Sequence, residues 1–148
     1  MHVHTDPSAR RPMWYALVTP DGELTVGDEP YHDIRAQLGD RSEGETGHGF
    51  LRGLHPVTAY FHAPYHDDDR RMNKVADGMF WELSGPVPPG PDAPYADDDF
   101  TPEDRVIKLR GPVAFIDRHN WGLGREHLDA LRTVHETVAR RLRRRGWL

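Results

Sequence analysis

The strongest constraint on the fold is a strand, a turn and a second strand in close succession near the start of the chain. The run M-W-Y-A-L-V-T at Met13–Thr19 is rich in the aromatic and β-branched residues typical of strands. In the turn Pro20–Gly22, Pro fixes φ, Asp bonds its own backbone and Gly tolerates positive φ. Leu24 and Val26 then form a short return strand. An antiparallel hairpin here favours an α+β fold over a doubly wound α/β fold, whose neighbouring strands are parallel.

The next segments predict a short helix and a loop. Asp28-Glu29-Pro30 is typical of a helix start, and Gly39 of a helix end. Between them an apolar stripe recurs at helical spacing, at Tyr31, Ile34 and Leu38. The polar, glycine-rich segment Asp40–Gly49 predicts a loop, and Phe50-Leu51 the start of a strand.

A clearer strand and a second helix follow. V-T-A-Y-F-H-A at Val57–Ala63 alternates, which places Val57, Ala59 and Phe61 on one face and Thr58, Tyr60 and His62 on the other. Asn73 is a plausible N-cap, and Gly85-Pro86 ends the helix. Apolar residues recur at helical spacing between these limits, at Val75, Ala76, Met79, Phe80 and Leu83.

The last third predicts strand and then helix. Val106–Arg110 and Pro112–Asp117 are either two strands or one strand bent at Gly111-Pro112. Arg125–Arg145 predicts the longest helix, with a seam of alternating three- and four-residue steps at Leu128, Leu131, His135, Val138 and Leu142. That seam suits either a partner helix or the face of a sheet.

These segments predict one α+β domain over residues 13–148, after a flexible leader at 1–12. We expect four to six strands in a small, mostly antiparallel sheet that starts with the hairpin. About three helices should pack on it, the last long and amphipathic. Residues 86–104 hold six of the 13 prolines and predict a long loop.

Composition excludes several classes of site. The chain has no cysteine, which rules out disulfides, thiol catalysis and cysteine-based metal centres. The N-terminal segment lacks an apolar signal-peptide core, and no apolar run approaches the roughly 18 residues of a spanning helix. We therefore expect a cytoplasmic protein without membrane association.

The tripeptide Asp-Asp-Asp occurs twice in similar contexts. A-P-Y-H-D-D-D-R spans Ala63–Arg70, A-P-Y-A-D-D-D-F spans Ala93–Phe100, and a shorter echo, P-Y-H-D, lies at Pro30–Asp33. The flanks differ, because the copies lie at a helix start, between a strand and a helix, and in a proline-rich loop. Repeated turn chemistry explains this better than a duplicated structural unit.

A divalent-cation site near the first acidic run is one interpretation. Its ligands would be His62, His66, Asp67 and Asp69. Adjacent aspartates on an extended chain point in alternate directions, however, and do not converge on one ion. The preferred interpretation is a solvated acidic turn whose aspartates stabilise the start of the following helix.

Other catalytic chemistry has little support in the sequence. His135 occupies the helix seam, where a hydrogen-bonded structural histidine is expected. No serine lies in a G-x-S-x-G elbow, and H-E-x-x-H is absent. Gly122, Gly124 and Arg125 stand where a phosphate-binding helix start would need them, but the third glycine of the fingerprint is His127. We therefore predict no catalytic residues and no cofactor.

Charge is distributed unevenly along the chain. Residues 1–124 carry 12 basic and 21 acidic residues, net −9, while residues 125–148 carry 7 basic and 3 acidic residues, net +4. Arginines at a helix C-terminus complement its dipole, and they can also contact phosphate groups or an acidic protein surface. The predicted contact residues are Arg140, Arg141, Arg143, Arg144, Arg145 and Trp147, together with Asp67, Asp68, Asp69, Asp97, Asp98 and Asp99.

The segments D-D-D-R-R-M-N-K-V-A-D-G-M-F-W-E-L and R-V-I-K-L-R-G-P-V-A-F-I resemble a family of uncharacterised small proteins from actinobacteria and their phages and plasmids. In that family an acidic turn leads to Asn-x-x-Ala at a helix start, and an Ile-x-Gly-x-Val strand follows. The matching positions are Asn73, Ala76, Gly111 and Val113, within a similarity over residues 13–117. A glycine doubled in the family is Gly39-Asp40 here. The resemblance implies an accessory role in an actinobacterial or mobile-element setting.

Three functional hypotheses follow. The first is a non-enzymatic accessory protein that binds a protein partner through the acidic loops and the basic tail. The second is a nucleic-acid-binding regulator that uses the arginine helix, although the acidic body opposes this. The third is a small metal- or nucleotide-dependent enzyme. A homodimer through the C-terminal helix is also compatible with the charge pattern.

Overall fold

The computed structural model describes residues 11–40, 45–62, 70–84, 109–119 and 121–148, and it confirms the α+β fold. Within these residues five strands form one antiparallel sheet in the order β2-β1-β5-β4-β3. The strands are β1 (Met13–Val18), β2 (Leu24–Glu29), β3 (Thr46–Phe50), β4 (Val57–His62) and β5 (Val113–Asp117). The helices are α1 (Tyr31–Gln37), α2 (Lys74–Leu83) and α3 (Arg125–Arg144), with a short 3₁₀ turn, η3, at Arg52–Leu54.

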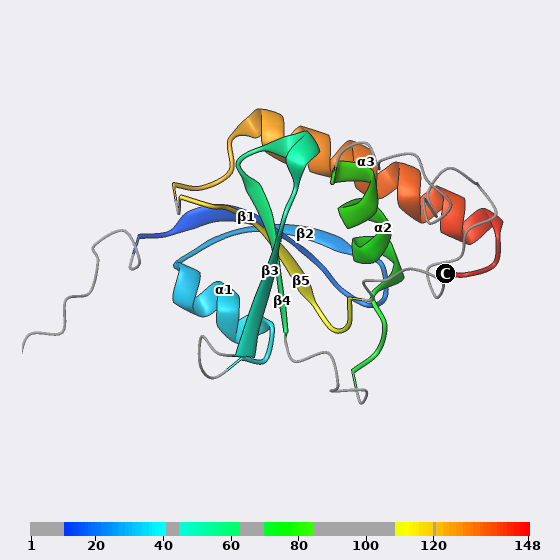
Figure 1. Cartoon of the computed structure of the whole chain (residues 1–148), viewed down its shortest axis with the longest axis horizontal. Coiled ribbons are helices and arrows are strands. Elements are labelled where there is room, and N and C mark those ends of the chain that lie inside the picture. The colour runs from blue at the N-terminus through cyan, green and yellow to red at the C-terminus, as the bar shows by residue number, and fades with distance from the viewer. Residues whose placement is uncertain (1–10, 41–44, 63–69, 85–108, 120) are drawn as a thin grey trace, which may run out of the picture.

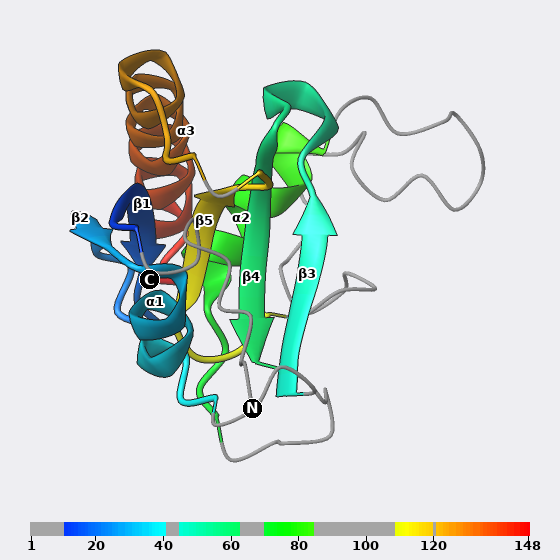
Figure 2. The ribbon, with the colours of Figure 1, turned by 90° about the vertical axis from the view of Figure 1, so that its left-hand side faces the viewer.

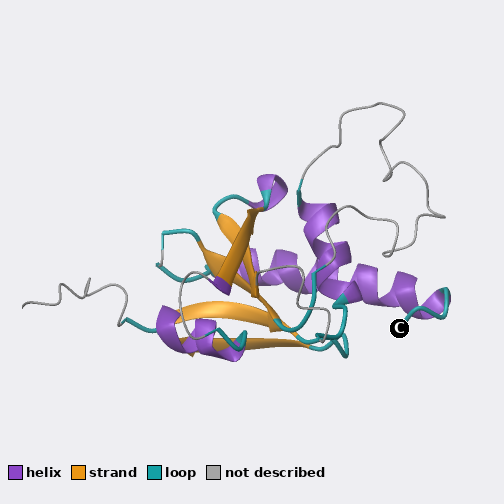
Figure 3. Cartoon of the chain, turned by 60° about the horizontal axis from the view of Figure 1, so that its bottom comes forward, coloured by secondary structure: helices purple, strands orange, loops and turns teal. Residues whose placement is uncertain are grey.

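The helices lie on both faces of the sheet. The larger core combines Val57 and Phe115 from the strands with Met79 of α2 and Leu131 of α3. The smaller core, on the opposite face, joins β1 and β5 to Ile34 of α1 and to Leu38 just after it. Figure 1 shows α2 beside the long α3, and Figure 2 shows α1 near β1 and β5 with β4 and β3 farther along the sheet. In Figure 3 the strands lie between the short helix on the left and the longer helices on the right.

Strand β5 joins the two hairpins of the sheet, which are formed by β1 with β2 and by β3 with β4. Phe115 pairs with Ala16 of β1 on one side and with Ala59 of β4 on the other. All five residues of β5 are buried. The last strand in the sequence is therefore the centre of the sheet.

The predicted first hairpin is confirmed, but its second strand is longer than expected. Gly22 has φ +87°, which suits glycine, and its N–H donates to the Thr19 carbonyl at 2.9 Å. Strand β2 continues through Glu29, so the prediction that Asp28 and Glu29 begin the helix was wrong. The local signals were ambiguous because acidic residues before a proline suit a helix start as well as a strand end.

Strand β3 covers Thr46–Gly49 of the segment that was expected to be a loop, and it ends at Phe50, where a strand was expected to begin. Gly47 and Gly49 point to the α2 side, where a Cβ would lie 2.6 Å from the Phe61 ring and 2.5 Å from the Phe80 ring. The glycines thus let two aromatic rings pack against the strand. Because glycine is depleted in strands, its presence here misled the sequence prediction.

Helix α2 begins as predicted. The Asn73 side chain accepts a hydrogen bond from the Ala76 N–H at 3.0 Å. Farther along, a Cβ on Gly78 would lie 2.6 Å from Cγ1 of Val138. Gly78 therefore permits the close approach of α2 and α3.

Helix α3 packs its predicted seam into the same molecule. Leu131, Val138 and Leu142 are buried, and Leu128 lies against the core. His135 Nε2 donates to the Gly22 carbonyl at 2.7 Å, so the expected structural histidine is confirmed. The seam binds α2 and the sheet face, which was one of the two predicted arrangements.

Part of the predicted β-structure lies outside the described residues. Positions 85–108 include most of Val106–Arg110 and the proline-rich loop. Arg110 forms an isolated bridge with Met72, and Gly111 has φ +70° before β5 begins at Val113. In the described part of the chain, every helix is too short or too polar to cross a bilayer.

Candidate functional site

The candidate site lies on the half of the sheet farthest from β1 and β2, on the α1 side. The pairing of β3 with β4 brings together Thr46 with His62, His48 with Tyr60, and Phe50 with Thr58, all on one face. We call these six residues the β3–β4 face. Helix α1 packs mainly on β1 and β5 and reaches this face through Tyr31.

Aromatic rings line the middle of the β3–β4 face. The His48 ring centroid lies 5.3 Å from that of Phe50 and 5.9 Å from that of Tyr60. Tyr31 meets Tyr60 edge-on at 5.9 Å. Phe50 is 50% exposed although it is a large apolar residue. The cluster is therefore ordered by ring contacts while part of it faces solvent.

Arg118, just after β5, covers one end of this face. Its guanidinium carbon lies 4.2 Å from the centroid of the Phe50 ring, within cation–π range. Arg118 Nε and the Thr58 hydroxyl are buried without a hydrogen-bond partner. Burial raises the pKa of Tyr60 above its usual value of 10.0, and the Arg118 charge opposes that rise.

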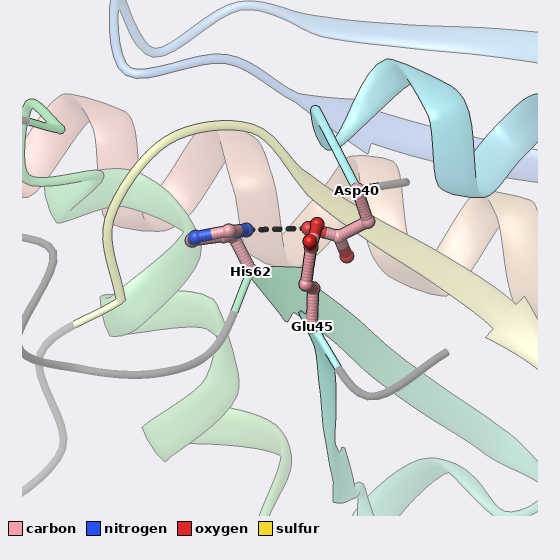
Figure 4. Close-up of side chains that lie close together, drawn as sticks. All are labelled: Asp40, Glu45 and His62. Carbon is pink, nitrogen blue, oxygen red and sulfur yellow. Dashed lines mark hydrogen bonds and ion pairs between the residues drawn. The ribbon is translucent and has the colours of Figure 1, made fainter. Parts of the chain in front are cut away.

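The other end of the face carries a cluster of two carboxylates and one imidazole. Figure 4 shows Asp40, Glu45 and His62 with their polar ends together. The candidate ligand atoms all lie within 4.8 Å of one another. His62 Nδ1 forms a hydrogen bond with one carboxylate oxygen of Asp40. The Thr46 hydroxyl donates to the other oxygen at 2.6 Å.

Three separate segments position this cluster. Asp40 follows Gly39, whose φ of +83° ends α1 and turns the chain toward the sheet. Glu45 immediately precedes β3, and His62 is the last residue of β4. Nearby, Arg70 Nη1 donates to the Leu38 carbonyl at 2.5 Å. This bond gives a partner to one of the carbonyls at the end of α1 that have no hydrogen bond within the helix.

The sequence identified one member of this cluster and missed two. His62 was a predicted metal ligand, but its expected partners His66, Asp67 and Asp69 lie outside the described residues. Asp40 and Glu45 lie far from His62 in sequence, and their proximity depends on the β3–β4 register. Because β3 was predicted to be a loop, nothing indicated that these residues meet.

The arginines predicted for contact are partly engaged within the chain. Arg141 pairs with Glu82 at 2.8 Å, and Arg140 with Glu136 at 2.9 Å. The Arg145 guanidinium lies 5.1 Å from the Trp147 ring. Arg143 and Arg144 are exposed.

The end of the chain packs back onto the body. Trp147 is partly buried against the larger core, and its carbonyl accepts from Lys74 Nζ at 3.0 Å. A Cβ on Gly22 would lie 3.1 Å from a methyl group of Leu148. The predicted acidic contact residues, Asp67–Asp69 and Asp97–Asp99, lie outside the described residues.

The candidate phosphate-binding residues form a loop and a helix start. Gly122 has φ +93°, and a Cβ there would lie 3.1 Å from the backbone nitrogen of Trp14. Gly124 is the N-cap of α3, and its N–H donates to His127 Nδ1 at 3.3 Å. Arg125 is exposed at the first helical position. Chain geometry accounts for glycine at position 122, whereas Gly124 has an ordinary extended backbone with room for a Cβ.

No protein-family model matches the chain, and neither a curated protein nor a solved structure matches it. The resemblance over residues 13–117 to small actinobacterial and phage proteins thus stays a prediction. The case for a function depends on the residues themselves.

Proposed function

We propose that this chain is a non-enzymatic accessory protein that acts in the cytoplasm by binding a protein partner through the β3–β4 face. The observation that carries the proposal is the half-exposed Phe50 ring with the Arg118 guanidinium stacked on it. Aromatic residues and arginine are enriched among the residues that dominate protein–protein binding energy.

The surroundings of Phe50 support this role. His48 and Tyr60 extend the aromatic surface, and ring contacts restrict their motion before a partner arrives. Little side-chain entropy is then lost on binding.

The position of β3 adds a second mode of contact. Among the described residues it is the last strand of the sheet, and we propose that its outer edge pairs with an extended segment of a partner. Its side chains on the β3–β4 face would then lie beside those of the added strand. We propose an actinobacterial or mobile-element setting for this interaction, in line with the resemblance described above.

The test is a comparison of matched variants of the full chain. Material that co-purifies with the wild type from the native host is identified, and its affinity for purified wild-type, Phe50→Ala and Arg118→Gln proteins is measured by calorimetry. We expect each substitution to weaken binding about tenfold or more, the scale of an interface hot spot. Thr133→Ala, on the exposed side of α3, is the control. Equal affinity of all four proteins would refute the proposal.

A nucleic-acid-binding role is the second candidate, favoured by the exposure of Arg143 and Arg144 on α3. It predicts an affinity for duplex DNA or RNA that falls steeply with salt and drops in the Arg143→Gln/Arg144→Gln double variant. Fluorescence anisotropy at low salt decides this. The engagement of Arg141 and Arg145 within the chain reduces the charge available, so we place this candidate second.

A metal- or nucleotide-dependent activity and a homodimer through α3 are separate alternatives. A thermal-shift screen with nucleotides tests the former, since a ligand that binds only the folded state raises Tm. Sedimentation of the wild type beside the Arg143→Gln/Arg144→Gln variant tests the latter.

A further inference from the structure

We propose that Asp40, Glu45 and His62 form a binding site for a single first-row divalent cation, with Zn²⁺ as the preferred ion. The site lies at one end of the β3–β4 face and does not depend on the partner-binding role proposed above.

Convergence from three segments is the first argument. Asp40 comes from the end of α1, Glu45 from the entry to β3 and His62 from the end of β4, yet their candidate ligand atoms lie within 4.8 Å of one another. The Asp40 side chain is 0% exposed and that of His62 is 9% exposed. Packing therefore holds two of the three ligands before an ion binds.

The surroundings of Asp40 are those of an oriented ligand. Thr46 donates to one carboxylate oxygen at 2.6 Å, which fixes the plane of the carboxylate and directs the other oxygen toward His62. Ligating carboxylates typically have such hydrogen-bonded support. The ion would replace the hydrogen that now joins Asp40 to His62. Zinc ligands at about 2.0–2.1 Å from the metal lie about 3.3 Å apart, so a small side-chain rotation opens the pair enough to admit it.

Electrostatics favours a cation at the same place. Glu45 brings a second carboxylate close to that of Asp40, and like charges at short range are unfavourable unless a positive charge lies between them. A divalent ion held directly by both carboxylates and the imidazole would place a positive charge between the two carboxylates.

The donor set selects the ion. One imidazole nitrogen and two carboxylate oxygens suit Zn²⁺, with a water in the fourth position, and they also suit Mn²⁺. Ca²⁺ requires six to eight oxygen ligands and does not use imidazole. Of these three ions we therefore expect Zn²⁺ to bind most tightly and Ca²⁺ not to bind at this site.

The experiment is calorimetric titration of the chelator-treated full chain with Zn²⁺, Mn²⁺ and Ca²⁺, with a thermal melt of each mixture. The variants are Glu45→Gln and His62→Gln, and the controls are Glu126→Gln and His119→Gln, which change the same residue types elsewhere. Because His2, His4 and His66 offer other imidazoles, all five proteins are also titrated in a background with these three changed to Gln.

We expect one Zn²⁺ per chain in that background, and a rise in Tm on binding. Glu45→Gln and His62→Gln should each lower the affinity at least tenfold, while both controls match the wild type. If His62→Gln fails to fold, the partly exposed Glu45→Gln decides alone. The proposal fails if Glu45→Gln binds like the wild type, if the wild type binds no Zn²⁺ at millimolar concentration, or if Ca²⁺ binds equally well.

Discussion

Asn73 joins three segments of the molecule through one side-chain amide. Its oxygen accepts from the Ala76 N–H, while its nitrogen donates to the carbonyls of Val18 at 2.8 Å and Gly111 at 2.9 Å. The residue is fully buried. The end of β1, the turn before β5 and the start of α2 therefore share a single polar anchor.

We predict that Asn73→Ala lowers the free energy of unfolding by about 3 kcal/mol, from one lost helix cap and two buried carbonyls left unpaired. Asn73→Asp keeps the cap acceptor but loses both donors, so it should also destabilise. Urea unfolding measures both variants, with Thr133→Ala as the control for loss of an exposed side-chain hydrogen bond. A loss below 1 kcal/mol for Asn73→Ala would contradict this role.

At the scale of single residues, the sequence predicted those hydrogen bonds that depend only on neighbouring residues in the chain. Asn73 was foreseen as a cap because capping depends on residues within one helical turn. Its bonds to Val18 and Gly111 were not foreseeable, since they cross from α2 to distant segments. The same limit hid Asp40 and Glu45, whose relation to His62 exists only after β3 pairs with β4.

Between elements, the contact of α2 with α3 at Gly78 and Val138 is a sensitive point of packing. A Cβ at Gly78 would lie 2.6 Å from Val138 Cγ1, closer than unstrained contact allows. Replacing glycine by alanine inside a helix normally gains about 1 kcal/mol, whereas overpacking costs about 1–3 kcal/mol. The second effect should dominate here.

We therefore predict that Gly78→Ala lowers the free energy of unfolding in the wild type but raises it by about 0.5–1 kcal/mol in a Val138→Ala background, where the helix preference is no longer opposed. A double-mutant cycle followed by urea unfolding measures the reversal. The same sign in both backgrounds would show that the two helices do not meet closely at Gly78.

Helices and strands whose apolar residues recur with one clear spacing were predictable from the sequence, and those without such a spacing were not. The seam of α3 and the alternation of β4 were recognised because each matches one period throughout its length. Strand β3 was missed because its core-facing positions are Gly47 and Gly49, so no apolar alternation is visible. Their role becomes apparent only when the rings of Phe61 and Phe80 are placed against them.

For the whole molecule, two tyrosines make stability depend on alkaline pH. Burial raises the pKa of Tyr15 above 10.0; the Gln37 donor opposes this rise and the Glu29 carboxylate adds to it. Burial likewise raises the pKa of Tyr60. Below about pH 10 both tyrosines are protonated in the folded and unfolded states alike, so neither changes the pH dependence of stability there.

We predict that the free energy of unfolding falls as pH rises through 10 toward the higher pKa values of the folded state, because the unfolded chain ionises first. Tyr60→Phe should make that fall less steep. Urea midpoints between pH 8 and 11, with tyrosinate absorbance as a parallel readout, measure the effect. The two proteins share every other ionisable side chain, including the other four of the five tyrosines, so the difference between their slopes isolates Tyr60. Identical slopes for the two proteins would exclude a contribution from Tyr60.

The central place of β5 has a consequence during synthesis. Both hairpins are complete long before Val113 leaves the ribosome, but β1 and β4 have no common neighbour until β5 is inserted between them. A nascent chain at that stage presents the inner edges of β1 and β4 as open pairing sites. Biogenesis of this protein therefore includes an interval in which two half-sheets must be kept from other polypeptides, and it ends only when β5 has been synthesised and inserted between them.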